Sequence, residues 1–152
     1  MGRDATIEFR RGEDQTERLP KLASELVSRG ISVLAAPNTA AALAAKTSTT
    51  TIPIVFFVGG DPVQLGLVAS LNRPGGNITG VTDLTVKVGP KRLELLHELM
   101  PAATVFALVV NPTTPLAQIE SRALLETAPV LGLERHVYRQ PANAISMRSL
   151  QR

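Results

Sequence analysis

The amino-acid sequence predicts an α/β fold built on doubly wound parallel sheets. Short β-branched and apolar runs alternate with stretches of helical periodicity along the chain. This order is typical of parallel strands joined by crossover helices. The runs at 52–58 and 104–110 are almost continuously apolar, as strands buried on both faces of a parallel sheet require. Polar turns that suit the start of a helix follow several of these runs.

Each expected strand has a local reason. Residues 5–10 alternate apolar and polar side chains, as a strand at the edge of a sheet does. Residues 31–36 are apolar enough for a strand buried on both faces, and residues 77–82 follow a Pro-Gly-Gly turn. The expected strands are 5–10, 31–36, 52–58, 77–82, 104–110 and 133–138.

The expected helices are bounded by capping residues and breakers. Leu19, Leu22 and Leu26 recur at spacings of three and four, which gives one apolar face. Asn38 or Thr39 can cap the alanine-rich helix that follows. The expected helices are 15–29, 40–47, 63–71, 89–100 and 116–131, with Pro129 shortening or kinking the last of these and a further helix beginning near Ala142.

Composition excludes several classes of function. The 152 residues carry a net charge of +3, and the basic residues are spread out, without the cluster that a nucleic-acid surface shows. The absence of Cys excludes a disulfide scaffold and a thiolate metal site. No apolar run approaches the ~20 residues of a membrane span. Residues 1–4 lack the apolar core of a signal peptide, so the sequence alone predicts a cytoplasmic location.

Three polar turns stand where ligands of an open α/β sheet bind, at the carboxyl ends of strands. They are residues 37–39, 59–62 and 111–114. Each precedes an expected helix, whose free N–H groups suit a carboxylate or phosphate. Structural alternatives remain at each turn: Asn38 and Thr39 as caps, the two glycines as a tight turn, and Asp61 as an N-cap or a partner for an ammonium group.

Catalytic and nucleotide-binding patterns are missing. The diglycine at 59–60 is neither GxGxxG nor a phosphate loop with Lys. His97 shares its helix face with Glu94, which indicates a solvated helix surface and not a general base. His136 lies in an outer strand with no obvious acidic partner, and the two histidines make no metal signature. The sequence therefore predicts neither an enzyme nor a cofactor site.

One stretch of the sequence is recognisable. Residues 49–56 with 59–63, 66–71, 73–77 and 79–81 closely resemble the ABC transporter substrate-binding proteins related to tryptophan- and tyrosine-binding lipoproteins. Residues 18–23, 41–46, 91–96 and 109–112 fit the same family. The resemblance extends to about Tyr138, is most specific from Ile52 to Val81, and is lost in the tail.

The resemblance implies a periplasmic binding protein-like fold of type I, with two Rossmann-like lobes around a cleft. Residues 1–83 would form the first lobe and 84–152 the start of the second, with a hinge crossing in 81–88. The implied function is the solute-binding component of a bacterial ABC importer, with a small solute such as an amino acid and ABC permease subunits as partners. Full-length members are periplasmic or lipid-anchored, which conflicts with the cytoplasmic location above.

The resemblance also implies gaps in both lobes. The family's first strand would precede residue 5, which leaves the strand at 5–10 without its central neighbour, and the second lobe stops after two strands. We therefore expect a truncated member that binds solute weakly or not at all by itself. The expected ligand-binding residues are Asn38, Thr39, Gly59, Gly60, Asp61, Thr82, Asp83, Asn111 and Thr113.

Two other functions remain open from the sequence. The same bilobed fold serves as the ligand-sensing domain of regulators and receptors, although no DNA-binding helix-turn-helix accompanies it here. An enzyme on a flavodoxin-like sheet is the third reading, and the missing catalytic groups argue against it.

Overall fold

Two parallel sheets organise the computed structural model, which describes residues 5–13 and 15–139. The first sheet has the order β1-β2-β3 and the second pairs β4 with β5. All neighbouring strands are parallel, which confirms the predicted α/β class. The strands are β1 (Leu34–Ala36), β2 (Ile54–Val58), β3 (Ile78–Thr82), β4 (Val105–Val110) and β5 (Glu134–Arg139). The helices are α1 (Leu19–Ser28), α2 (Thr39–Ser48), α3 (Gly89–Leu99) and α4 (Ala117–Val130), with short 3₁₀ helices η1 (Thr16–Arg18) and η2 (Thr85–Val88).

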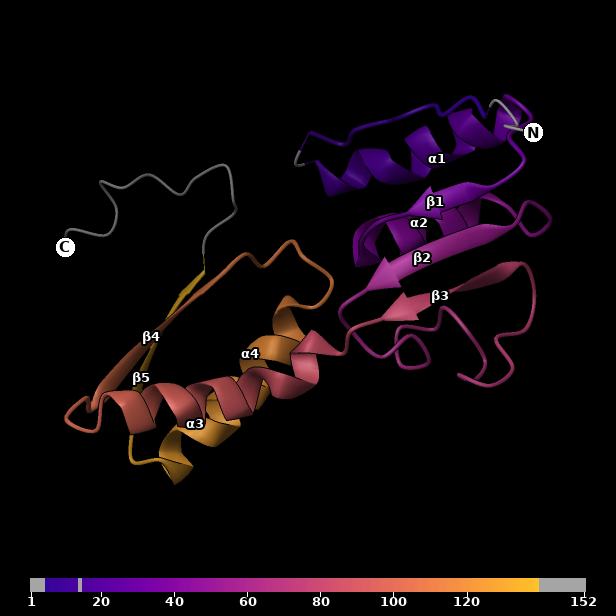
Figure 1. Ribbon diagram of the computed structural model, residues 1–152. Coiled ribbons are helices and arrows are strands. Elements are labelled where there is room, and N and C mark those ends of the chain that lie inside the picture. The colour runs from indigo at the N-terminus through magenta and orange to yellow at the C-terminus, as the bar shows by residue number, and fades with distance from the viewer. Residues whose placement is uncertain (1–4, 14, 140–152) are drawn as a thin grey trace.

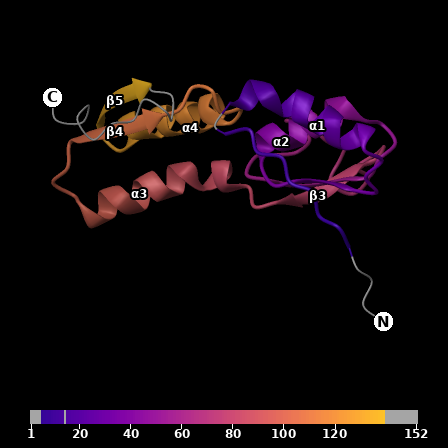
Figure 2. The same cartoon turned by 90° about the horizontal axis from the view of Figure 1, so that it is seen from above.

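Each sheet packs with its own helices. We call α1, β1, α2, β2 and β3 the N-terminal unit, and α3, β4, α4 and β5 the C-terminal unit. The two units lie side by side, joined by η2, and the carboxyl ends of β1, β2 and β3 point toward the C-terminal unit (Figures 1 and 2). Strand β4 likewise runs toward the N-terminal unit, so the loops that follow β1, β2, β3 and β4 lie near the junction.

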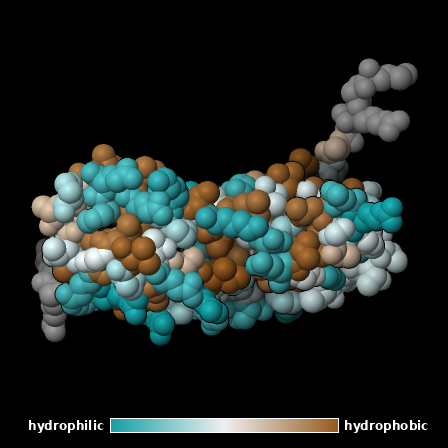
Figure 3. Space-filling model, turned by 90° about the horizontal axis from the view of Figure 1, so that it is seen from below, coloured by the Kyte–Doolittle hydropathy of each residue, from teal (hydrophilic) through white to brown (hydrophobic). Residues whose placement is uncertain are grey.

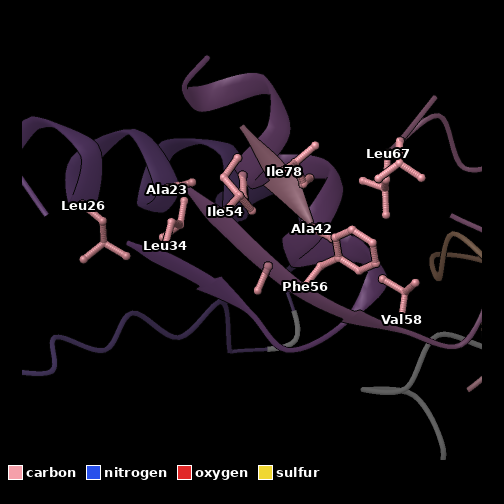
Figure 4. Close-up of a cluster of buried hydrophobic side chains, with 12 residues drawn as sticks. Ala23, Leu26, Leu34, Ala42, Ile54, Phe56, Val58, Leu67 and Ile78 are labelled. Atoms are coloured by element: carbon pink, nitrogen blue, oxygen red, sulfur yellow. The ribbon is translucent and has the colours of Figure 1, made fainter. Parts of the chain in front are cut away.

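The core of the N-terminal unit lies between its sheet and its helices. Ile54, Phe56 and Val58 of β2 point into this core, where they meet residues of α1, α2 and the neighbouring strands (Figure 4). The C-terminal unit has a smaller buried cluster of Leu93, Ala128 and Leu133, which joins α3, α4 and the start of β5. Burial of aliphatic side chains is thus concentrated in the N-terminal unit.

The expectation that three strands are buried on both faces is wrong. In β1 and β2 buried and exposed residues alternate, and Val55 and Phe57 of β2 are exposed. In β4 exposed residues such as Val105 and Val109 alternate with half-buried ones. Among the described residues, helices cover one face of these strands, so every second apolar side chain remains in contact with solvent.

The segment 5–10 is not a strand, contrary to prediction. Its apolar side chains Ile7 and Phe9 are 72% and 75% exposed. An ion pair joins Glu8 to Arg29 at 3.0 Å, but a solvent-exposed pair of this kind contributes little stability. Alternation of side chains does not make a strand without a neighbouring strand to share its backbone hydrogen bonds, and no described strand lies in register with this segment.

The predicted helix at 63–71 is also absent. The backbone makes one turn, in which the N–H of Leu67 donates to the carbonyl of Pro62 at 2.8 Å. Gly66 then adopts a φ of +68°, the left-handed conformation that ends helices. The strand expected at 31–36 shortens to β1 because residues 31–33 precede the paired register.

The remaining elements agree with prediction to within a few residues. Gly75 and Gly76 both have positive φ in the expected turn before β3. Helix α4 continues through Pro129, which lies in its last turn. The helix expected near Ala142 lies outside the described residues. No helix in the described part of the chain has both the length and the apolar character that a membrane span needs.

Replacement of Ile54 by Ala tests the N-terminal core. The side chain of Ile54 is fully buried, so we expect the Ile54→Ala substitution to lower the free energy of unfolding by about 2–5 kcal/mol. Urea denaturation followed by circular dichroism measures this loss. Val130 is 84% exposed, so Val130→Ala should change stability by less than about 0.5 kcal/mol. Equal losses in the two variants would contradict this description of the core.

Candidate functional site

A hollow of about 690 Å³ lies along β1 and the loop that follows it. Most of its lining comes from the N-terminal unit, and the segment at the start of α4 contributes from the C-terminal unit. Apolar side chains of α1 and α2 and several charged side chains line it. The lining includes Arg10, Arg11, Glu13, Leu19, Leu22, Leu26, Asn38, Thr39, Ala41, Thr114, Leu116 and Glu120.

Asn38 and Thr39 stand at the hollow, as the sequence predicts for ligand contacts. Asn38 is also the N-cap of α2, because its Oδ1 accepts a hydrogen bond from the N–H of Ala41 at 2.9 Å. Thr39 is buried at the first position of the helix. In the first turn of a helix, N–H groups have no partner within the helix, so the N-terminus of α2 offers donors and a partial positive charge beside the hollow.

The diglycine turn packs tightly against the crossing between the units. Thr82 Oγ1 donates to the carbonyl oxygen of Gly60 at 2.8 Å, and Thr85 Oγ1 donates to that of Gly59 at 3.4 Å. Asp83 Oδ1 accepts from the N–H of Thr85 at 3.1 Å. The structure therefore brings Gly59, Gly60, Thr82 and Asp83 together, as a hydrogen-bonded cluster whose polar groups bond one another.

Asp61 caps the turn that follows the diglycine. Its Oδ1 accepts from the N–H groups of Val63 and Gln64 at 3.0 and 3.4 Å. Its Oδ2 lies 3.5 Å from Lys87 Nζ, so the ammonium group that Asp61 meets belongs to the chain itself. The hydrogen bond from Val63 is the main cause that lowers the pKa of Asp61, and Lys87 adds to this shift.

Asn111 and Thr113 are not part of the hollow beside β1. Asn111 Oδ1 accepts from both the N–H and the Oγ1 of Thr113, at 3.0 and 2.8 Å, which forms an Asx turn before α4. Asn111 instead lines a second hollow of about 390 Å³, between α3, β4 and α4. Their neighbour Thr114 lines both hollows.

Sequence reasoning missed several residues of the hollow. Thr114 ends the predicted turn at 111–114, and Leu116 is the first residue of the predicted helix after it. Arg10 ends the predicted strand at 5–10 and Arg11 follows it, so the rule that ligands bind beyond strand ends would have found them. Leu22 and Leu26 read as core residues because their spacing is that of a buried helix face.

The histidines differ in detail from the prediction. His97 is half-buried, and its Nδ1 is buried without a hydrogen-bond partner among the described residues. Glu94, the predicted neighbour of His97, pairs with Lys91 at 2.9 Å. His136 does have an acidic partner, because its Nε2 lies 3.4 Å from Glu134 on the same strand. Within residues 5–13 and 15–139, no three His, Asp or Glu side chains gather as metal ligands do.

Comparison with known proteins identifies the family. Residues 2–145 match the ABC transporter substrate binding protein family. The chain belongs to this family. Its members bind small solutes and work with ABC permeases, and they are not enzymes. The predicted family is therefore confirmed.

One curated protein is similar to this chain in sequence, and two solved structures share its fold. A tyrosine-binding protein of Clostridioides difficile is 33% identical over 128 residues, which cover 84% of this chain and 36% of that protein. The crystal structure of an ABC domain from Streptococcus pneumonia in complex with L-Trp superposes with a TM-score of 0.76 at 22% identity, over 90% of this chain and 47% of that one. A conserved domain protein from Vibrio cholerae gives 0.74 at 31% identity, over 83% and 42%. The chain thus spans less than half the length of these relatives.

The lowered pKa of Asp61 makes stability depend on pH. A carboxyl group whose pKa in the folded state lies below its ordinary value of 3.8 stabilises the fold above that value, and this contribution is lost as the pH falls through the folded pKa. We expect the parent chain to lose stability below about pH 4 more steeply than Asp61→Asn, which keeps the cap but not the charge. Urea unfolding at pH 3, 5 and 7 measures the difference. Parallel pH profiles for the two chains would refute this assignment.

Proposed function

We propose that this chain provides a solute-binding cleft of an ABC importer's substrate-binding protein, and that the solute is an amino acid. Family membership supports the binding of a small solute. The names of two relatives support an amino acid, since one is a tyrosine-binding protein and the other was solved with L-Trp. The role in import, the association with ABC permease subunits and a place outside the cytoplasmic membrane belong to the same proposal.

The observation that carries the proposal is the hollow beside β1. Its volume of about 690 Å³ falls within the ~300–1,000 Å³ of typical small-molecule sites. Residues of both units line it, which is the arrangement a cleft between two lobes requires. The predicted boundary between residues 83 and 84 is consistent with the separate cores of the two units, and it remains part of the proposal.

The lining matches the chemistry of an amino acid. We place the solute's carboxylate at the N-terminus of α2, where Asn38 and Thr39 stand and the helix dipole is positive. Glu120, which also lines the hollow, supplies a negative charge for the solute's ammonium group. The apolar faces of α1 and α2 then accept the solute's side chain. In this arrangement five of the predicted ligand-binding residues stabilise the crossing between the units and do not contact the solute: Gly59, Gly60, Asp61, Thr82 and Asp83.

Chemical shifts of backbone amides test this placement even when binding is weak. We expect titration of the ¹⁵N-labelled chain with L-tryptophan or L-tyrosine to shift the amides of residues 38–41 and those of Thr114, Leu116 and Glu120, because these residues line the hollow from both units. Each D-enantiomer serves as the control, because the carboxylate and ammonium positions are then exchanged relative to the side chain. Shifts confined to other segments, or no shifts with any amino acid, would overturn the proposal.

A substitution that preserves the cap sharpens this test. Asp is as good an N-cap as Asn, so Asn38→Asp should leave α2 intact while it adds a negative charge beside the solute's carboxylate. We expect the dissociation constant to rise by about fivefold or more, which corresponds to roughly 1 kcal/mol. Asn72→Asp is the matched control, because Asn72 is exposed and does not line the hollow. An equal effect of the two substitutions would argue against the carboxylate position.

A further inference from the structure

Leu116, at the start of α4, reaches the diglycine turn behind β2. A Cβ atom built on Gly60 would lie 2.7 Å from Leu116 Cδ2 and 3.1 Å from Leu65 Cδ1. A Cβ atom on Gly59 would lie 2.6 Å from Thr85 Oγ1 and 3.6 Å from Leu116 Cδ1, so at residue 59 the crossing excludes a side chain while Leu116 is only in ordinary contact. Non-bonded carbon atoms are in optimal contact at about 3.5–4.0 Å, so no side chain fits at residue 60 while Leu116 keeps its place.

The backbone conformation does not explain these two glycines. Gly59 and Gly60 are not among the residues with positive φ, so their torsion angles are open to other amino acids. Gly60 is needed because it has no side chain, and the space that a side chain would fill forms a notch that Leu116 occupies. The hydrogen bond from Thr82 Oγ1 to the carbonyl of Gly60 fixes the notch on the N-terminal unit.

Backbone hydrogen bonds hold Leu116, whose side chain enters the notch, in place on the C-terminal unit. The carbonyl oxygen of Leu116 accepts from the N–H of Glu120 at 2.9 Å in the first turn of α4. The N–H of Ala117 donates to the carbonyl of Thr114 at 3.1 Å, which fixes the turn before it. Leu116 also lines the hollow beside β1, so this apolar contact lies at the edge of the proposed cleft.

We propose that Leu116 and the notch at Gly59 and Gly60 form a latch that holds the two units in one arrangement across the hollow. An apolar side chain seated in a rigid notch favours one relative position of the parts that carry it. Hydrophobic side chains gather near the middle of the molecule, where the units meet (Figure 3). The latch is inferred from the contact between Leu116 and Gly60, and only its effect on solute affinity rests on the proposed function.

Distances between spin labels on the two units test the latch without any solute. The chain has no Cys, so Lys21→Cys in α1 and Glu98→Cys in α3 introduce two unique labelling sites, both exposed. Double electron–electron resonance then gives the distribution of the distance between them. We expect Leu116→Ala to broaden this distribution, because the side chain no longer fills the notch. We expect Gly60→Ala to shift it, because the new methyl group displaces Leu116.

The double variant and a matched control complete the design. Gly60→Ala combined with Leu116→Ala should lose the shift and keep the broad distribution, because the two methyl groups no longer collide. Leu99→Ala is the control for loss of a leucine, since Leu99 is 80% exposed on α3. If Gly60→Ala fails to fold, Leu116→Ala alone decides the question. A distribution for Leu116→Ala identical to that for Leu99→Ala would overturn the latch.

The consequence for solute binding is measured separately. If the latch favours the arrangement that binds solute, Leu116→Ala should raise the dissociation constant for L-tryptophan or L-tyrosine by about fivefold or more. Failure of the parent chain to bind any amino acid would refute the proposed function and leave the distance result as evidence for the latch. Binding by the parent with unchanged distances in every variant would refute the latch alone.

Discussion

Parallel pairing of β2 with both of its neighbours is the constraint on which the rest of the molecule depends. The register places Ala36 opposite Phe56 and Phe56 opposite Gly80, so the three strands end at the same edge of the sheet. Backbone hydrogen bonds between parallel strands allow little sliding, because a shift by one residue would move Ile54 and Val58 out of the core. The N-terminus of α2, the diglycine turn and the crossing to α3 are therefore brought to one side of the molecule by strand pairing.

The elements that could be predicted from the sequence are those whose local pattern and tertiary contacts agree. Helix α1 has one apolar face, on which Ala23 and Leu26 are buried, and Asn38 caps α2 through its own side chain. Residues 5–10 show that side-chain alternation is insufficient, because a strand also needs a hydrogen-bonded neighbour. At 63–71 Asp61 as an N-cap and Pro62 at the first helical position favoured a helix, and the left-handed conformation of Gly66 ended it after one turn. Neither outcome is visible in local propensity, which tertiary context overrides.

The candidate site was predictable to the extent that it follows strand ends. That rule places Asn38 and Thr39 at the hollow. It does not place Asn111 and Thr113 at this hollow, because the loop after β4 contributes Thr114 and Leu116 there and contributes Asn111 to the second hollow. The apolar walls were not predictable as a site, because the leucines of α1 have the spacing of core residues whether they face a sheet or a ligand. Distinguishing the two requires knowing which neighbours pack against them.

The polar groups of the crossing explain how the two units can be joined by a short segment and still hold a defined position. Thr82 and Thr85 bond the diglycine carbonyls, the N–H of Val86 donates to Gly59 at 3.3 Å, and Lys87 pairs with Asp61. These interactions anchor the crossing to the N-terminal unit as far as Lys87, so its side chains have their partners within the protein. In the proposed function, recognition of a charged solute falls to groups whose hydrogen-bonding capacity is not used inside the fold. The N–H groups of Thr39 and Ala40, which precede the capped Ala41, meet that condition. The fixed crossing and the contact at Leu116 together determine how far the start of α4 stands from those donors.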